Sequence, residues 1–178
     1  MEMDEKLEVY PGGADLSKYF DSVEVEVKNF EDYTRSGGSS VRFVDANVFI
    51  YAILAPRRAL SDRELEIKRR AKAILARINE GEEALTTVVH LSEVANVLED
   101  YAGTRLAAAF IRDVLSRENI VVEAVSASDY LASSLLALEK GVSVNDALAY
   151  VVMMKRNIHE IYTFDKHFEK LNVKIVQE

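Results

Sequence analysis

The sequence predicts an α/β fold, a three-layer sandwich built on a five-stranded parallel sheet. Between residues 41 and 178, short runs rich in β-branched and aromatic residues alternate with amphipathic segments, and this alternation is typical of parallel strands joined by helices. Gly81, Gly103 and Gly141 each stand at the end of an expected helix. Hydrophobic residues make up 49% of the chain, which is ample for one core.

The first element is the stretch from Val41 to Tyr51. It begins as an apolar run and turns amphipathic after Asp45, which predicts a strand ending at Asp45 and a helix from about Ala46 to Leu54. A carboxylate at the carboxyl end of a parallel strand lies where open α/β sheets bind ligands. Asp45 could instead only cap the helix, because Asp is a favoured cap residue.

The later part of the chain continues the alternation of strands and helices. A helix should run from the cap Ser61 to about Glu80, and Thr87 should cap another that reaches Tyr101. Thr104 opens a further helix, Ser126 or Ser128 one that ends at Lys140, and Ser143 or Asn145 one that ends near Arg156. The remaining strands are expected at residues 84–86, 120–122, 160–163 and 173–176.

Residues 1–40 are set apart from this domain, which spans 41–178. They carry ten acids against four bases, and the Ser-Gly-Gly-Ser-Ser at 36–40 is typical of a flexible linker. Residues 23–27 alternate with period two, which suggests an edge strand. The segment could be a tethered peptide that folds onto the domain as an added strand. It could equally be an acidic tail or an addition made for expression.

Several classes of protein are excluded by what the sequence lacks. There is no cysteine, secretory signal or apolar run approaching the roughly 18 residues of a membrane span, so we expect a cytoplasmic protein. The domain has no glycine cluster for a phosphate-binding loop and no Gly-x-Ser-x-Gly elbow. His90, His159 and His167 lack zinc-ligand spacing, and we interpret them as surface or packing residues.

Acids recur where strands end or helices begin. Asp45 ends the first strand, Glu93 lies in the second turn of the helix after the second, Asp146 opens a late helix, and Asp165 follows the strand at 160–163. These junctions share one edge of a parallel sheet, and four carboxylates there would repel one another without a cation. Oxygen ligands favour Mg²⁺ or Mn²⁺, and such a site suits phosphodiester hydrolysis.

Each acid also has a plainer interpretation. Asp146 could be only a helix cap, Glu93 a solvated helix residue and Asp165 a turn residue. The recurrence of all four in one pattern is more informative than any single position.

The sequence resembles the PIN-domain ribonucleases, and among them the VapC-type toxins of toxin–antitoxin pairs. The resemblance covers about residues 41–178 and rests on four short motifs. These are Val-Asp-Ala-Asn-Val-Phe-Ile-Tyr at 44–51, the stretch from Thr87 to Glu93, Val-Asn-Asp-Ala-Leu-Ala at 144–149, and Thr-Phe-Asp-Lys-His-Phe at 163–168.

The resemblance implies a five-stranded parallel sheet, Mg²⁺- or Mn²⁺-dependent cleavage of RNA, a homodimer and an antitoxin-type protein partner. It makes Asp45, Glu93, Asp146 and Asp165 the catalytic, metal-site acids. Asn47, Asn145 and Thr163 are the expected supporting residues. Residues 1–40 could then mimic the tail of an antitoxin.

A basic stretch provides candidate RNA contacts. Residues 55–77 carry eight bases against three acids, and we assign phosphate binding to Arg57, Arg58, Arg69 and Arg70, although a solvated helix face fits equally well.

Two other functions stay open. The chain could be a non-catalytic PIN-like module that binds RNA or a protein, and it would then need no metal. It could also be an aspartyl-phosphate enzyme with Asp45 as the nucleophile, although Asn47 stands where such phosphatases commonly carry a second Asp.

Overall fold

A computed structural model describes residues 41–54 and 58–178. The strand expected at 23–27, the rest of the segment 1–40 and Arg57 lie outside these residues. The strands are β1 (Arg42–Val44), β2 (Ala84–Thr87), β3 (Ile120–Glu123), β4 (Glu160–Tyr162) and β5 (Lys174–Val176). The helices are α1 (Ala46–Ile53), α2 (Asp62–Asn79), α3 (Val88–Ala102), α4 (Thr104–Ser116), α5 (Ala127–Lys140), α6 (Val144–Lys155) and the 3₁₀ helix η3 (Lys166–Lys170).

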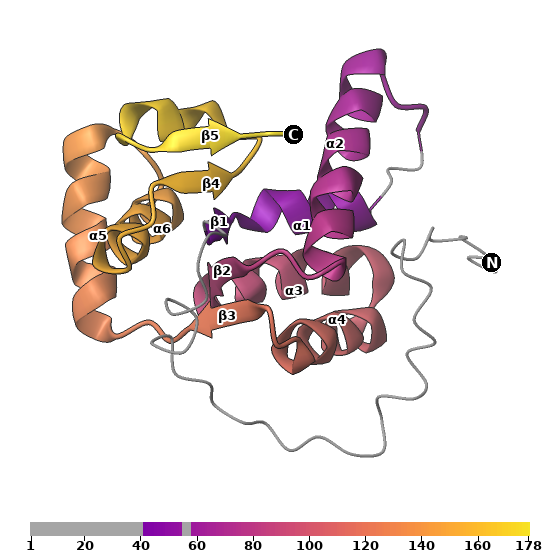
Figure 1. The fold of residues 1–178 in the computed structure, drawn as a ribbon, viewed down its shortest axis with the longest axis horizontal. Coiled ribbons are helices and arrows are strands. Elements are labelled where there is room, and N and C mark those ends of the chain that lie inside the picture. Colours follow the sequence, from indigo (N-terminus) through magenta and orange to yellow (C-terminus); the bar gives the residue numbers. More distant parts are fainter. Residues whose placement is uncertain (1–40, 55–57) are drawn as a thin grey trace.

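The strands form one sheet in the order β3-β2-β1-β4-β5, and every neighbouring pair is parallel. β1 therefore lies at the centre, with Phe43 opposite Leu85 on one side and Ile161 on the other. Figure 1 shows the five strands one above another, with α5 and α6 on one side and α1 to α4 on the other. The predicted α/β sandwich with a five-stranded parallel sheet is confirmed.

Side chains alternate between the two faces of the sheet and so build two cores. Phe43, Leu85 and Ile161 point into one core, where α6 contributes Leu148 and Met153. The neighbouring residues in each strand point the other way. Val44, Ala84 and Tyr162 belong to the second core, which α1 to α4 complete. The β-branched and aromatic runs of the sequence are thus buried on both sides, as parallel strands require.

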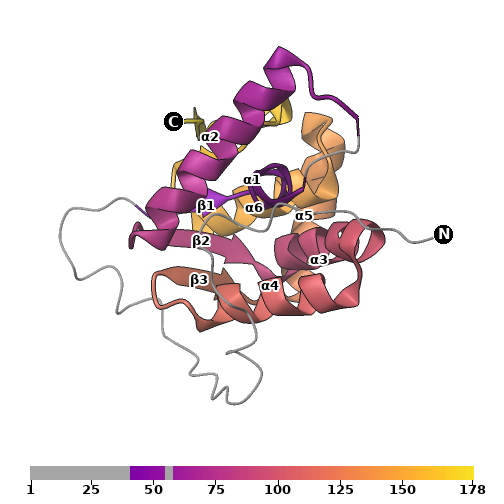
Figure 2. The same cartoon turned by 90° about the vertical axis from the view of Figure 1, so that its right-hand side faces the viewer.

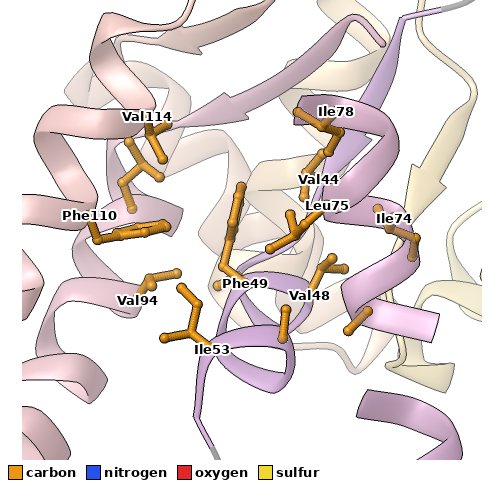
Figure 3. Packing of buried hydrophobic residues seen from close by; sticks show 14 of the residues in the cluster. Val44, Val48, Phe49, Ile53, Ile74, Leu75, Ile78, Val94, Phe110 and Val114 are labelled. Atoms are coloured by element: carbon orange, nitrogen blue, oxygen red, sulfur yellow. The ribbon is translucent and has the colours of Figure 1, made fainter. Parts of the chain in front are cut away.

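The second core centres on Phe49 of α1. Its ring meets that of Phe110 from α4 edge to face, with 5.4 Å between the centroids. Figure 3 shows Phe49 between Phe110 and Val94 on one side and Leu75 of α2 on the other. Figure 2 shows α2 as a long helix beside α1, with α3 and α4 packed together. Helix α1 is thereby fixed on three sides, and α1 carries part of the site described below.

The helix ends follow the sequence signals closely. Ser61, Ser126 and Ser143 each form a capping box with the acid three residues later. Gly141 ends α5 in the left-handed conformation, with φ at 63°. Several boundaries differ from expectation by one residue, and two of these bear on the site: β1 ends at Val44 and β4 at Tyr162, so Asp45 and Thr163 each stand one residue beyond their strand. None of the helices in 41–54 and 58–178 is long and apolar enough to span a membrane.

Two leucines of α2 give a matched test of this packing. Leu75 is 0% exposed and Leu65 is 51% exposed on the same helix. Leu75→Ala should lower the free energy of unfolding by about 2–5 kcal/mol, because it leaves a cavity in the core. Leu65→Ala should change it by less than about 0.5 kcal/mol. Urea unfolding followed by circular dichroism measures both, and equal effects would contradict the assignment of α2's buried face.

Candidate active site

The four predicted acids come together in one cavity at the carboxyl edge of the sheet. Asp45 follows β1, Asp165 follows β4 by three residues, and Glu93 lies in the second turn of α3, directly after β2. Asp146 is in the first turn of α6, and because α6 leads back into β4, its N-terminus lies at the same edge. All four line a cavity of about 800 Å³.

Asp45 is held by the two polar residues predicted to support it. The Thr163 hydroxyl and the Asn47 amide both donate to its Oδ2, at 2.7 and 2.6 Å, and Asn47 also donates to the Thr163 hydroxyl at 3.0 Å. Asp45 occupies the N-cap position of α1 but makes no capping hydrogen bond with its side chain. The interpretation as a mere helix cap is therefore wrong, and its carboxylate is held by contacts across the site.

Asp146 caps α6, as one interpretation of it predicted, and it also lines the cavity. Its backbone N–H donates to the Ser143 hydroxyl at 3.0 Å, and its Oδ2 accepts from the Ser143 backbone N–H at 3.2 Å. These bonds form the capping box that starts α6. The side chain is nevertheless buried, and it lines the cavity beside the other acids. The cap fixes the direction in which the carboxylate points.

The side chain of Glu93 is held by a hydrogen bond from a residue of α6, so it is not a freely solvated helix residue. The Asn145 side chain donates from Nδ2 to Glu93 Oε2 at 2.9 Å, and its own Oδ1 accepts from the Tyr130 hydroxyl at 3.2 Å. A chain of contacts thus runs from α5 through α6 to α3. Asn145 therefore contacts one of the four predicted acids directly.

Asp165 caps the 3₁₀ helix that follows β4. Its Oδ1 accepts from the His167 backbone N–H at 2.8 Å and lies 3.1 Å from the His167 ring nitrogen Nδ1. The turn interpretation of Asp165 is thus correct, and the residue also belongs to the site. One ligand atom each from Asp146, Asp165 and His167 lies within 4.8 Å of the other two.

The electrostatics of the cavity reflect the crowding of like charges. Burial raises the pKa of Asp45 to about 7 against the opposing hydrogen bond from Thr163, and the charges of Asp146 and Glu93 raise it further. Burial likewise raises the pKa of Asp146 against its bonds to Ser143, and the charge of Asp165 adds to the rise. Burial is the larger cause for both carboxyls, and the neighbouring acids add to it.

This donor set suits a hard divalent cation. Carboxylate oxygens dominate the cavity, and Asp146, Asp165 and His167 are close enough to share one ion. A cation would also relieve the repulsion that raises the pKa of Asp45. The residues present therefore fit a site for a divalent cation.

The histidines were predicted to be surface or packing residues, and one of them is also near the acids. His90 is buried, its ring packs edge to face on Phe43, and burial lowers its pKa to about 4, as expected for a packing residue. His167 instead lines the cavity. Its spacing, two residues after Asp165, was the only signal, and it is too common in turns to be specific.

The arginines predicted to bind RNA lie on or next to α2, and those that the structure describes bond to glutamates. Arg58 pairs with Glu64, while Arg69 and Arg70 both pair with Glu66. Arg70 also lines a second cavity, of about 560 Å³, which includes Asp165. Of the three described arginines, none lines the first cavity.

With this geometry described, the chain can be compared with known proteins. The family model of the PIN domain matches residues 42–174. The chain belongs to the PIN domain family. The match includes all four acids and all three supporting residues. Comparison with curated proteins gives no match.

Solved structures with the same fold include three from toxin–antitoxin systems. VapC20 of Mycobacterium tuberculosis, described as a sarcin–ricin loop cleaving toxin, has a TM-score of 0.58 at 24% identity, covering 76% of this chain and 98% of that one. A toxin–antitoxin complex from Klebsiella pneumoniae has a TM-score of 0.53 at 18% identity, covering 76% and 95%. VapBC2 of Rickettsia felis, bound to a promoter DNA fragment, has a TM-score of 0.51 at 14% identity, covering 76% and 97%. They share the PIN fold with this chain.

The raised pKa of Asp45 predicts how the stability of this PIN domain depends on pH without metal. The folded protein keeps the Asp45 proton up to about pH 7, whereas the carboxyl of the unfolded chain loses it near its ordinary pKa of 3.8. Its stabilising contribution is therefore complete below pH 3.8 and is lost as the pH rises through about 7. Asp45→Asn keeps an oxygen acceptor and cannot ionise.

We therefore expect the melting temperature of the wild type to fall relative to that of Asp45→Asn between these two pH values. Thermal unfolding in EDTA, measured on both proteins across the range, makes the comparison. Parallel curves would contradict the environment assigned to Asp45.

Proposed function

We propose that this PIN domain is a divalent-metal-dependent endoribonuclease that hydrolyses RNA phosphodiester bonds, and that it is the toxin of a toxin–antitoxin pair. The observation that carries the proposal is the meeting of Asp45, Glu93, Asp146 and Asp165 in one open cavity. Burial and the charges of neighbouring acids raise the pKa of Asp45 and of Asp146, and a bound cation would oppose both effects.

The cation would be Mg²⁺ or Mn²⁺, held by Asp146, Asp165 and His167 with Asp45 and Glu93 nearby. When bound, such an ion activates water and neutralises the charge that develops on phosphate during hydrolysis. The chain itself supplies orientation. Thr163 and Asn47 fix the Asp45 carboxylate, and Ser143 fixes that of Asp146. Preorganised ligands of this kind reduce the reorganisation needed during the reaction.

The toxin assignment rests on the structural neighbours. VapC20 is described as a sarcin–ricin loop cleaving toxin, and two other neighbours come from toxin–antitoxin complexes. By that likeness we propose that this chain binds an antitoxin-type protein. The cytoplasm, where RNA targets and a partner antitoxin occur together, is the proposed location.

We also propose that the chain forms a homodimer. Three leucines at helical spacing on α5 are solvent exposed: Leu131 at 63%, Leu135 at 62% and Leu138 at 83%. A stripe of this kind is typical of a surface that another protein covers. A second copy of the chain is the proposed occupant. Light scattering should give twice the 20.0 kDa of one chain, and a mass of one chain would contradict the proposal.

The nuclease proposal is tested by cleavage of a mixed pool of single-stranded RNA and transfer RNA. Wild type should cleave in Mn²⁺ and not in EDTA. Asp146→Asn should reduce cleavage at least about 100-fold, because it removes a ligand charge. Asn145→Ala, which frees Glu93, should cost about 10- to 100-fold, as loss of a ligand's hydrogen-bond partner usually does.

Cleavage that persists in EDTA, or that Asp146→Asn leaves unchanged, would contradict the proposed site. If the full chain does not cleave, residues 41–178 should be assayed alone. Activity that appears on removal of residues 1–40 would support their proposed inhibitory role. If neither form cleaves and neither binds Mn²⁺, the non-catalytic PIN-like module becomes the better description.

For Arg57, Arg58, Arg69 and Arg70 we propose phosphate binding, and Arg70 has the most support because its cavity includes Asp165. RNA affinity should then fall steeply with salt, and Arg70→Gln should reduce the slope of log K against log salt by about 0.7–0.9. Arg112→Gln on α4 provides a control outside both cavities. An unchanged slope for Arg70→Gln would remove it from the interface.

A further inference from the structure

Two aromatic rings lie in the same cavity as the acids. Tyr51 of α1 and Phe164, the residue between Thr163 and Asp165, both line it. Their ring centroids are 5.9 Å apart, and the ring planes meet at 68°. Neither ring has a part in the cation site proposed above, so their position beside it needs a separate explanation.

Phe164 is held firmly. Its backbone N–H donates to Asn47 Oδ1 at 3.2 Å, and its side chain packs against the core formed with α1 to α4. The backbone N–H of Asp165 donates in turn to the Thr163 hydroxyl at 3.0 Å. Phe164 is thus fixed by the same residues that hold Asp45.

Tyr51 provides the exposed part of the pair. It lies one helical turn after Asn47 on α1, and so on the same face of the helix. Its side chain is 43% exposed, and the ring of Phe164 limits how it can turn. Within residues 41–54 and 58–178, its hydroxyl makes no hydrogen bond. Tyr51 therefore offers a partly exposed aromatic ring among the residues that line the cavity.

We propose that Tyr51, supported by Phe164, is a stacking platform for an unpaired nucleobase next to the cleaved phosphate. This inference rests on the proposed ribonuclease function and names the form of RNA that the site accepts. An exposed ring beside a phosphate-processing site suits a base because the faces of all four bases are flat, apolar and uncharged. The acids of the cavity would repel any further anionic group there.

The platform restricts the substrate to RNA whose bases are free to stack. A base inside a duplex already stacks on its neighbours, so it has to leave the helix before it can lie on Tyr51. Single strands and loops therefore satisfy the site, whereas continuous duplex does not. Stacking discriminates only weakly among the four bases. Strong sequence preference would have to come from contacts elsewhere.

The absence of tryptophan from the chain allows a direct test. Tyr51→Trp creates a single fluorescent reporter at the platform, and Tyr101→Trp creates a control at a 72% exposed position near the end of α3. Both are made in full-length protein carrying Asp146→Asn, so that RNA stays intact. The probes are a short mixed-sequence single-stranded RNA and an abasic ribose–phosphate chain of equal length, each with Mn²⁺.

We expect the base-containing RNA to quench the reporter at position 51 and the abasic chain to leave it unchanged. The control reporter should respond to neither. Equal quenching by the two probes would overturn the proposal, because the reporter would then respond to the ribose–phosphate chain and not to bases. RNA that binds without quenching the reporter would also overturn it, because no base would then lie on Tyr51.

Substitutions at the same position separate stacking from structural support. Tyr51→Ala should weaken binding of the base-containing RNA by about tenfold and leave binding of the abasic chain unchanged. Tyr51→Phe keeps the ring and should bind as wild type does. Equal losses for both probes would overturn the proposal. If wild type binds neither probe and cleaves no RNA, the ribonuclease function itself is contradicted. That result differs from RNA that binds with the same affinity whether or not Tyr51 is present, which contradicts only the stacking platform.

Discussion

Repulsion among carboxylates at the carboxyl edge of a parallel sheet is the constraint on which this structure depends. Asp45 and Asp146 are buried, and Glu93 and Asp165 lie close enough to raise their pKa values. A fold gains nothing in stability from such a cluster without a counter-ion, because burial and like charge both disfavour ionisation. The rest of the domain supplies the rigidity that keeps these groups together.

That rigidity comes from the two cores on the faces of the sheet. β1 is central, and its alternating side chains join both cores, so Asp45 at its end can shift only if the sheet does. α6 is pinned by Leu148 and Met153, which fixes Asp146. Hydrogen bonds from Thr163 and Asn145 then set the orientation of individual carboxylates. Packing of the two cores thus sets the positions of the acidic residues, and hydrogen bonds set the orientation of their carboxylates.

The sequence allowed the fold to be predicted well because each local signal agreed with the topology. Serine caps, glycine ends and buried β-branched runs fell where the chain later formed elements. The four acids were predictable for the same reason, since parallel topology brings their junctions to one edge. Boundaries were less accurate: the strand before Asp45 and the strand before Thr163 each end one residue early.

What could not be predicted depends on contacts between distant residues. His167 joins the cavity only because η3 turns it toward Asp146. The pairing of Tyr51 with Phe164 joins residues from α1 and from the segment after β4. The basic run beside and along α2 was visible in the sequence, but its ion pairs were not: Arg58 pairs with Glu64, and Arg69 and Arg70 pair with Glu66.

The capping box at Ser143 has a practical consequence. Because one carboxylate both starts α6 and lines the cavity, alanine at position 146 would remove a helix-initiating contact together with the ligand. A form of the domain meant to trap intact RNA, for crystallography or for isolating targets from cells, is best made with an amide at that position. The amide keeps an oxygen acceptor for the Ser143 N–H and loses only the charge.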